Sequence, residues 1–291
     1  MPPATNIRVC VRVRPLTIPP SHPPSQAPSP SPPEPPASET QPVTTVECWN
    51  LTDTQISPNP TFTCPYYDMS SAKNKRIGYQ YDHLFTPTHT TAQIYDTAVQ
   101  SVVSSAMEGY HSSVFAYGQT ASGKTYTMQG THNHPGIVPL AVEECFDVAT
   151  SSRFREFLLR VSYMEIYNEQ IIDLLSPGSL TAGRVGGGVR IYEHKTAGVV
   201  VKGLKEEVVV SQEQVFALIC AGEAHRHVGS TTMNANSSRS HTIFRLVIES
   251  RAKSAEADEG EATSVRVSTL SLVDLAGSES VKQSNTEGER R

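Results

Sequence analysis

The chain has 291 residues, of which 37% are hydrophobic and 18% charged, and its formal net charge at pH 7 is -5. That composition is typical of a soluble globular protein with a polar segment, and the negative balance argues against a chain built to bind nucleic acid or another polyanion. Because no apolar stretch approaches the roughly 20 residues that span a bilayer, we expect no membrane as a partner either.

The cysteines are Cys10, Cys48, Cys64, Cys145 and Cys220, an odd number at wide spacings. This pattern predicts a reduced, intracellular protein with neither a disulfide framework nor a zinc site. The first residues lack a basic region followed by an apolar run, so we expect no secretory signal and a cytoplasmic location.

The first predicted strand covers residues 7–13, where apolar and polar residues alternate. A segment rich in Pro and Ser follows at residues 17–42, and it holds 11 of the 21 prolines. Such a run cannot form a packed core, so we expect a disordered, solvated insertion. Its PxxP spacings, which an SH3-type domain could bind, and its Ser-Pro pairs at Ser29 and Ser31 leave a role as a ligand or phosphorylation site open.

Beyond the insertion, strands and helices alternate. Hydrophobic spacing predicts helices over residues 91–108 and 212–221, and strands over residues 113–117, 157–167, 242–250 and 265–273. An acidic tip, residues 252–264, joins the last two strands. The pattern favours an α/β fold with a central mixed sheet, mostly parallel in its core, and helices on both faces.

The segment from Gly118 to Thr125 reads GQTASGKT, which satisfies G-x-x-x-x-G-K-[ST] in full and follows a predicted strand. Its backbone N–H groups can surround phosphates, Lys124 can reach the β- and γ-phosphates, and the Thr125 hydroxyl can bind Mg²⁺. The cofactor-binding set from this loop is Gly118, Gln119, Thr120, Ala121, Ser122, Gly123, Lys124 and Thr125. We interpret the loop as a P-loop for a nucleotide.

Two further segments carry polar groups near strand ends. Asp274 ends an apolar strand and is followed by Gly277, so its carboxylate can lie on the Mg²⁺ side of the loop and the Gly277 N–H can approach a γ-phosphate. The run from Asn234 to His241 reads NANSSRSH, which by itself is more typical of a helix-capping loop.

Together, GQTASGKT, NANSSRSH and DLAGSE resemble the motor domains of the kinesin superfamily. Arg12-Val13-Arg14-Pro15 and the segment from Tyr163 to Glu169 are also similar to that family, and the resemblance extends over nearly the whole chain outside residues 17–42, 178–188 and 252–264. Among subfamilies, the chain most resembles the centromere-associated mitotic kinesins.

The resemblance implies a microtubule-stimulated ATPase of the P-loop type, with ATP and Mg²⁺ as cofactors. Arg12, Arg14 and Pro15 would hold the adenine with Tyr126, and Thr125 and Ser238 would bind Mg²⁺ with Asp274 behind them. The remaining catalytic residues implied are Asn234 and Ser237, which would order the attacking water, Gly277, and the closing pair Arg239 and Glu279.

Microtubules are the partner that the resemblance implies. The contacts would come from a hairpin at residues 193–204, with Lys195 and Lys202, and from residues 280–291, with Lys282, Arg290 and Arg291. The resemblance also implies a homodimer formed through a stalk, and a place on the cytoskeleton that extends to the spindle and kinetochore. Because the family continues beyond Arg291 into a further helix, strand and neck linker, we expect residues 1–291 to be a partial motor domain.

The sequence also allows two other interpretations. One is a truncated, nucleotide-dependent microtubule-binding module with little or no motility, and the three motifs do not separate it from a motor. The other is a GTPase, whose guanine-reading N-K-x-D normally follows the loop. The pair Asn74-Lys75 precedes the loop and continues into Arg76-Ile77, so this interpretation is poor.

Overall fold

The structure is a computed structural model that describes residues 7–15, 49–58, 78–176, 189–195, 198–230, 238–253 and 265–279. The insertion at 17–42, most of the acidic tip, Asn234, Ser237 and the segment 280–291 lie outside these residues. The chain divides into two compact units, Met1–His89 and Thr90–Arg291, and each is described by itself.

The first unit contains two small sheets. Strand β1 (Cys10–Arg12) pairs in parallel with β5 (His83–Phe85), while β2 (Trp49–Leu51), β3 (Gln55–Pro58) and β4 (Tyr79–Gln80) form an antiparallel sheet. The Val13 N–H donates to the Phe85 carbonyl at 2.8 Å and the Asp82 N–H to the Val9 carbonyl at 3.0 Å, which continues the pairing beyond β1. The strand predicted at residues 7–13 is therefore confirmed, although its regular part is shorter.

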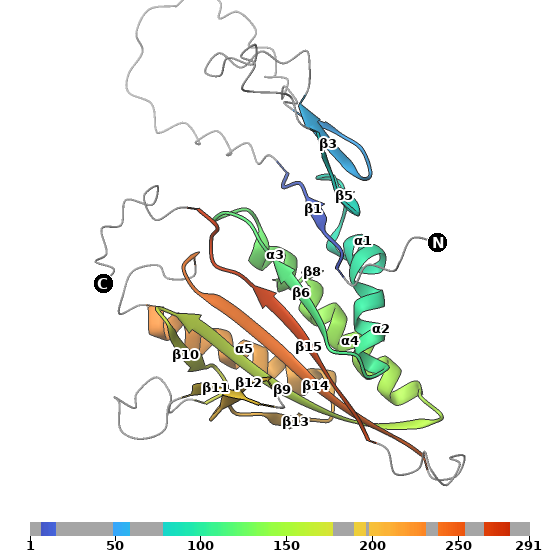
Figure 1. Ribbon diagram of the computed structural model, residues 1–291, viewed down its shortest axis with the longest axis vertical. Helices are drawn as coiled ribbons and strands as arrows, with labels where there is room; N and C mark the ends of the chain where they lie inside the picture. The colour runs from blue at the N-terminus through green and yellow to red at the C-terminus, as the bar shows by residue number, and fades with distance from the viewer. Residues whose placement is uncertain are drawn as a thin grey trace, which may run out of the picture. The chain divides into compact units, whose positions relative to one another are not determined.

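The second unit is built on a six-stranded sheet with the order β10-β9-β14-β15-β6, and β13 pairs with the outer part of β9 (Figure 1). Its strands are β6 (Ser112–Ala116), β9 (Arg155–Tyr167), β10 (Gln170–Asp173), β13 (Glu207–Val209), β14 (His241–Ala252) and β15 (Arg266–Asp274). Two hairpins stand outside it, β7 (Gly130–Thr131) with β8 (His134–Pro135), and β11 (Arg190–His194) with β12 (Gly198–Lys202).

The sheet is mixed, as expected, but its described part is mainly antiparallel. Only β15 and β6 run parallel, whereas β14 pairs antiparallel with both β9 and β15. The prediction of a mostly parallel core is therefore wrong for the described strands of this sheet. The reason is that β14 and β15 are the two arms of a long hairpin, which reverses the chain without a crossover helix.

Much of the core lies on one face of this sheet. Alternating residues of β9, β14 and β15 are buried there, among them Val161, Leu246, Leu270 and Leu272, and Leu246 is in register with both Val161 and Leu270. Every second side chain of a strand points to the same face, so these residues share one side of the sheet. This is the face against which the helices pack.

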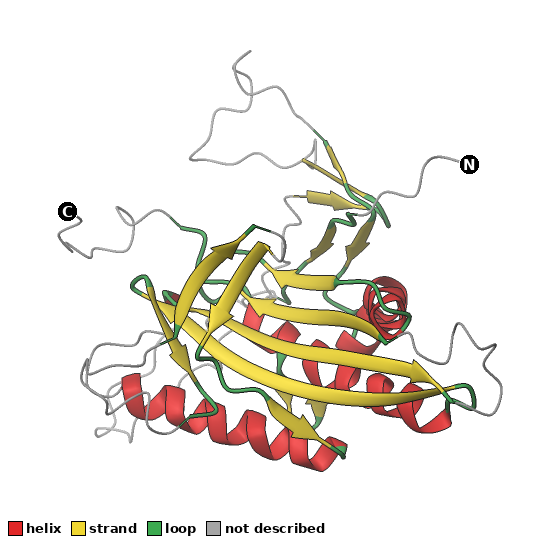
Figure 2. Cartoon of the chain, turned by 60° about the horizontal axis from the view of Figure 1, so that its bottom comes forward, coloured by secondary structure: helices red, strands yellow, loops and turns green. Residues whose placement is uncertain are grey.

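The helices are α1 (Thr91–Ile94), α2 (Gln100–Met107), α3 (Lys124–Met128), α4 (Ile137–Ser151) and α5 (Gln212–Ser230), with a π-helical segment η1 (Tyr95–Val99) between α1 and α2. In Figure 2 the longer helices lie beneath the sheet and pack along one of its faces. Flanking helices are confirmed. We expected helices on both faces of the sheet, but the helices of the described residues cover only one.

The helix predicted at residues 91–108 is present with nearly these bounds, but it is interrupted. Thr90 begins it with a capping box that includes Gln93. At Gln100 the backbone N–H reaches back to the Tyr95 carbonyl, five residues earlier, which makes the π-helical turn. Helix α5 is longer than its predicted residues 212–221. None of the described helices has both the length and the apolar character that crossing a membrane would require.

Candidate nucleotide site

Three adjacent strands bring the sequence motifs together. The phosphate loop follows the end of β6, the segment 274–279 (the second switch) begins at the end of β15, and residues 238–240 of NANSSRSH (the first switch) precede β14. Asp274 is in register with Ala116 of β6 on one side and with Thr242 of β14 on the other. Because β6 and β15 are parallel and β14 runs antiparallel to them, these three chain segments lie at one edge of the sheet.

The phosphate loop turns directly into α3. Gly123 precedes that helix with a φ of 100°, in the left-handed region that favours glycine. Lys124 is the first helical residue, and its Nζ donates to the carbonyls of Gly118 at 3.0 Å and Gln119 at 2.9 Å. The lysine therefore lies back across its own loop, with its charge held where phosphates would be bound.

Thr125 and Asp274 form the base of the site. The Thr125 hydroxyl donates to Asp274 Oδ2 at 2.5 Å. Asp274 is only 6% exposed, and its Oδ1 has no hydrogen-bond partner among the described residues. Burial raises the pKa of Asp274 above its ordinary 3.8, while the Thr125 hydroxyl and the charges of Arg226 and Lys124 oppose this.

This donor set suits Mg²⁺. A hydroxyl and a buried carboxylate with a spare oxygen are hard oxygen ligands, and Mg²⁺ is usually held by one or two such groups together with water and substrate phosphates. Thr125 and Asp274, joined to each other, fit that ion. Ser238, the third expected ligand, is among the described residues, and its carbonyl accepts a hydrogen bond from Gly277 of the second switch.

Backbone hydrogen bonds join the two switches to each other and to the loop. The Gly277 N–H donates to the Ser238 carbonyl at 2.8 Å, and the Ser278 N–H donates to the Gly118 carbonyl at 3.0 Å. The Ala276 N–H donates to His241 Nδ1 at 3.1 Å. A change in one switch must therefore break or shift bonds made by the other.

Glu279 contacts the phosphate loop. Its carboxylate accepts from the Thr120 N–H at 2.8 Å and from the Thr120 hydroxyl, and these bonds, the hydroxyl one first, lower the pKa of Glu279. Glu279 and Arg239, both described, do not form an ion pair here, and Arg239 is exposed. The ion pair between Arg239 and Glu279 is expected only when the site closes around a nucleotide, so it stays a prediction. A Cβ on Gly277 would lie 2.4 Å from the Thr120 Oγ1, so glycine leaves room for this contact.

The other predicted site residues lie in the first unit, on α3 or outside the described residues. Arg12, Arg14 and Pro15 belong to the first unit, so their place beside the adenine stays a prediction. Tyr126 is on α3 and partly exposed. Asn234 and Ser237, and with them Lys282, Arg290 and Arg291, lie outside the described residues.

The hairpin expected at residues 193–204 begins earlier, as β11 and β12 paired antiparallel from Arg190 with Lys202 to His194 with Gly198, and its contact with microtubules stays a prediction. Lys195 and Lys202 are both exposed. Large apolar side chains are exposed beside them, including Ile191 and Val199. An apolar surface next to lysines is typical of a protein-binding element.

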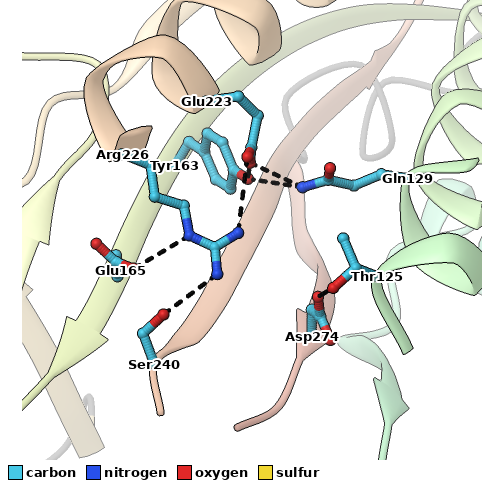
Figure 3. A network of polar contacts seen from close by, with 8 residues as sticks. All are labelled: Thr125, Gln129, Tyr163, Glu165, Glu223, Arg226, Ser240 and Asp274. Atoms are coloured by element: carbon cyan, nitrogen blue, oxygen red, sulfur yellow. Dashed lines mark hydrogen bonds and ion pairs between the residues drawn. The ribbon is translucent and has the colours of Figure 1, made fainter. Parts of the chain in front are cut away.

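A polar network near the site was not identified from the sequence. Arg226 on α5 lies among Glu165, Glu223 and Ser240, close to Thr125 and Asp274 (Figure 3). One signal could have indicated it. Glu165 shares a face of its predicted strand with Leu159, Val161 and Tyr163, and a carboxylate on an apolar face requires a partner.

A strand, a glycine-rich phosphate loop and a helix, with two polar segments at the neighbouring strand ends, define a P-loop nucleotide-binding protein. The Kinesin motor domain family matches residues 37–291, so the chain belongs to that family.

Similar proteins agree with this assignment. The chain is 53% identical over 221 residues to the Kinesin-like protein KIN-7D, chloroplastic, of Oryza sativa subsp. japonica (76% of this chain, 21% of that protein). It is 49% identical over 233 residues to Kinesin-related protein 11 of Dictyostelium discoideum (78% of this chain, 32% of that protein). The chain thus spans only about a fifth to a third of these relatives.

A solved structure has the same fold. It is described as the structure of a fast kinesin, with implications for ATPase mechanism and interactions with microtubules. The TM-score is 0.69 at 33% identity, over 83% of this chain and 63% of that one. The P-loop sheet flanked by helices is therefore a kinesin motor fold. The names of these relatives do not mention centromeres, so the subfamily stays a proposal.

Proposed function

We propose that this chain binds ATP with Mg²⁺, hydrolyses it at a rate that microtubules stimulate, and acts as the ATP-using part of a microtubule motor. The observation that carries this proposal is the meeting of the phosphate loop and both switches at one sheet edge, linked by the bonds from Gly277 to Ser238 and from Thr120 to Glu279. Membership of the kinesin family and the fold of the solved relative support it.

Lys124, Thr125 and Asp274 supply the binding part of this function. Lys124 would exchange the carbonyls of Gly118 and Gln119 for phosphate oxygens, because a phosphate is the stronger acceptor for an ammonium. Thr125 and Asp274 would hold Mg²⁺, which when bound neutralises charge on the phosphates.

The switches supply the part that responds to the nucleotide. The Gly277 N–H is bonded to Ser238 and would have to leave that carbonyl to donate to a γ-phosphate. Glu279 would have to leave Thr120 to pair with Arg239. Asn234 and Ser237 would order the attacking water, and Arg12, Arg14, Pro15 and Tyr126 would hold the adenine.

The test is phosphate release from Mg·ATP by the wild-type chain, with and without polymerised microtubules. Lys124→Ala should bind no fluorescent ATP analogue, because the phosphates lose the main cation of the loop. Lys253→Ala is the matched control, since Lys253 bonds to the Ser152 carbonyl at the far end of β14. Wild-type affinity in Lys124→Ala would refute the phosphate-loop assignment.

The same assay separates the motor from the alternative, a microtubule-binding module with little hydrolysis. Co-sedimentation with microtubules that depends on the nucleotide, without stimulated phosphate release, would favour that alternative. Release that microtubules accelerate would favour the motor, and the hairpin β11–β12 with Lys195 and Lys202 is the described surface proposed to contact tubulin.

We also propose the finer assignments that the resemblance implies, namely a centromere-associated mitotic kinesin on spindle microtubules and kinetochores, acting as a homodimer. A fluorescent fusion of the full-length protein in dividing cells should decorate the spindle. The relative KIN-7D carries the word chloroplastic in its name, so a plastid signal in place of the spindle is the result that would contradict this location. Light scattering of the full-length protein tests the dimer.

A further inference from the structure

The side chain of Arg226 joins three elements of the second unit (Figure 3). On α5, it is 9% exposed. Its Nε donates to Glu165 Oε1 of β9 at 3.1 Å, and its Nη2 donates to the Ser240 hydroxyl at 3.2 Å. Ser240 is 2% exposed and is the last residue of the first switch before β14 begins. One guanidinium therefore fixes the position where the first switch enters the sheet.

The network continues to the phosphate-loop helix. Glu223, one turn before Arg226 on α5, faces it with Oε2 at 3.6 Å. The other oxygen of Glu223 accepts from Gln129 Nε2 at 2.7 Å and from the Tyr163 hydroxyl. Gln129 is the residue that caps the end of α3, and α3 starts at Lys124. A continuous set of polar contacts thus runs from the phosphate-loop helix to the first switch.

Stability alone gives little reason for this arrangement. Taking one arginine and two carboxylates out of water costs about as much as their mutual attraction returns, and apolar replacements of such groups are often no less stable. A guanidinium, however, holds partners in fixed directions through its planar fork, which a lysine cannot do. The contacts of Arg226 therefore contribute a fixed orientation of Glu165, Glu223 and Ser240 more than stability.

The network also borders the metal side of the site. A cavity of about 20 Å³ has Gln129 and Tyr163 of the network in its lining, together with Thr242 and Asp274. Thr242 is in register with Asp274 and lies two residues after Ser240. A displacement of Ser240 would therefore be passed along β14 to the strand pair that carries Asp274.

We propose that Arg226 is a positioning residue: through Ser240 it holds the first switch in register with the phosphate-loop helix, so that Ser238 and Arg239 reach the nucleotide in one arrangement. This inference rests on the proposed ATP hydrolysis. Arg226 touches none of the reacting atoms, and it acts on them through Ser240.

Two variants test this role in the 291-residue chain. Ser240→Ala removes the hydroxyl that Arg226 holds and leaves the ion pairs of Arg226 with Glu165 and Glu223 intact. Arg226→Lys keeps the charge and loses the fork. The matched control is Ser268→Ala, because Ser268 is also a buried serine of this sheet but donates to the Ala106 carbonyl, on α2.

Ser240→Ala should lower kcat for microtubule-stimulated ATP hydrolysis about tenfold, which corresponds to the loss of one hydrogen bond from a charged donor, with KM for ATP nearly unchanged. Arg226→Lys should lower kcat at least as much. Amide hydrogen exchange of residues 238–242 should become faster in both variants, while exchange in the middle of β14 stays slow. Ser268→Ala should keep the wild-type kcat and exchange.

The exchange experiment needs no activity, so it separates two failures. A wild-type chain that does not hydrolyse ATP would remove the proposed function, and faster exchange at 238–242 in Ser240→Ala would still support the positioning role. Wild-type kcat together with wild-type exchange in Ser240→Ala would overturn the inference. So would a uniform rise in exchange over the whole of β14, because that shows a purely structural contribution.

Discussion

Asp274→Asn should make the nucleotide-free protein more stable at neutral pH, although it removes a residue proposed to serve Mg²⁺. In the structure Asp274 is buried with one carboxylate oxygen unpaired, and burial raises its pKa. An unsatisfied buried polar group costs roughly 1–3 kcal/mol, and more when it is charged. The bond that Thr125 would make to a neutral amide is weaker, and this loss offsets about 1 kcal/mol of the stability that the variant gains. The expected gain in unfolding free energy is about 1 kcal/mol.

The pH dependence has a definite sign. Well below pH 3.8, the ordinary pKa, Asp274 is protonated in both the folded and the unfolded chain and contributes nothing. As the pH rises from there to the raised folded-state pKa, the unfolded chain loses its proton more readily, so wild-type stability falls relative to Asp274→Asn. Above the raised folded-state pKa the difference is constant.

Denaturant unfolding of both proteins in EDTA, between about pH 4 and pH 7, measures this difference. In a second series, Mg·ATP at about 100 times its Kd should stabilise the wild type by about 2.7 kcal/mol, and Asp274→Asn by clearly less. A difference between the two proteins that does not change with pH would refute the assignment of a buried carboxylate with a raised pKa. Equal stabilisation by Mg·ATP would refute its role beside the metal.

Two other predictions concern the insertion and the second switch. Deleting residues 17–42 should leave the affinity for ATP and the melting temperature nearly unchanged, because loop length adds little closure free energy, and a large loss of either would show that the segment packs on the domain. In a chain extended to a complete motor domain, Glu279→Ala should still bind ATP but hydrolyse it slowly and with little microtubule stimulation. The double variant Arg239→Glu with Glu279→Arg should recover part of the rate. Steady-state phosphate-release assays measure both. Normal turnover of Glu279→Ala would exclude the closing pair, whereas loss of ATP binding would assign Glu279 to support of the loop through Thr120.

Local sequence determined the elements and the phosphate loop. The alternation in residues 157–167 predicted β9, because successive side chains of a pleated strand point to opposite faces. The glycines of GQTASGKT and the helix after them predicted the turn at Gly123, since its left-handed φ disfavours other residues. These features depend on neighbours within a few positions, so a single sequence contains them.

Contacts between distant residues were decided by the tertiary structure. The sequence motifs did not reveal that Glu279 would contact Thr120, that Arg226 would join Glu165 to Ser240, or that the sheet around β14 would be mainly antiparallel. Each depends on which strands become neighbours and in which register, and a shift of one residue would turn every side chain of a strand to the other face. The residue types at the site could be named from the chain, but their partners were set by the pairing of β6, β15 and β14.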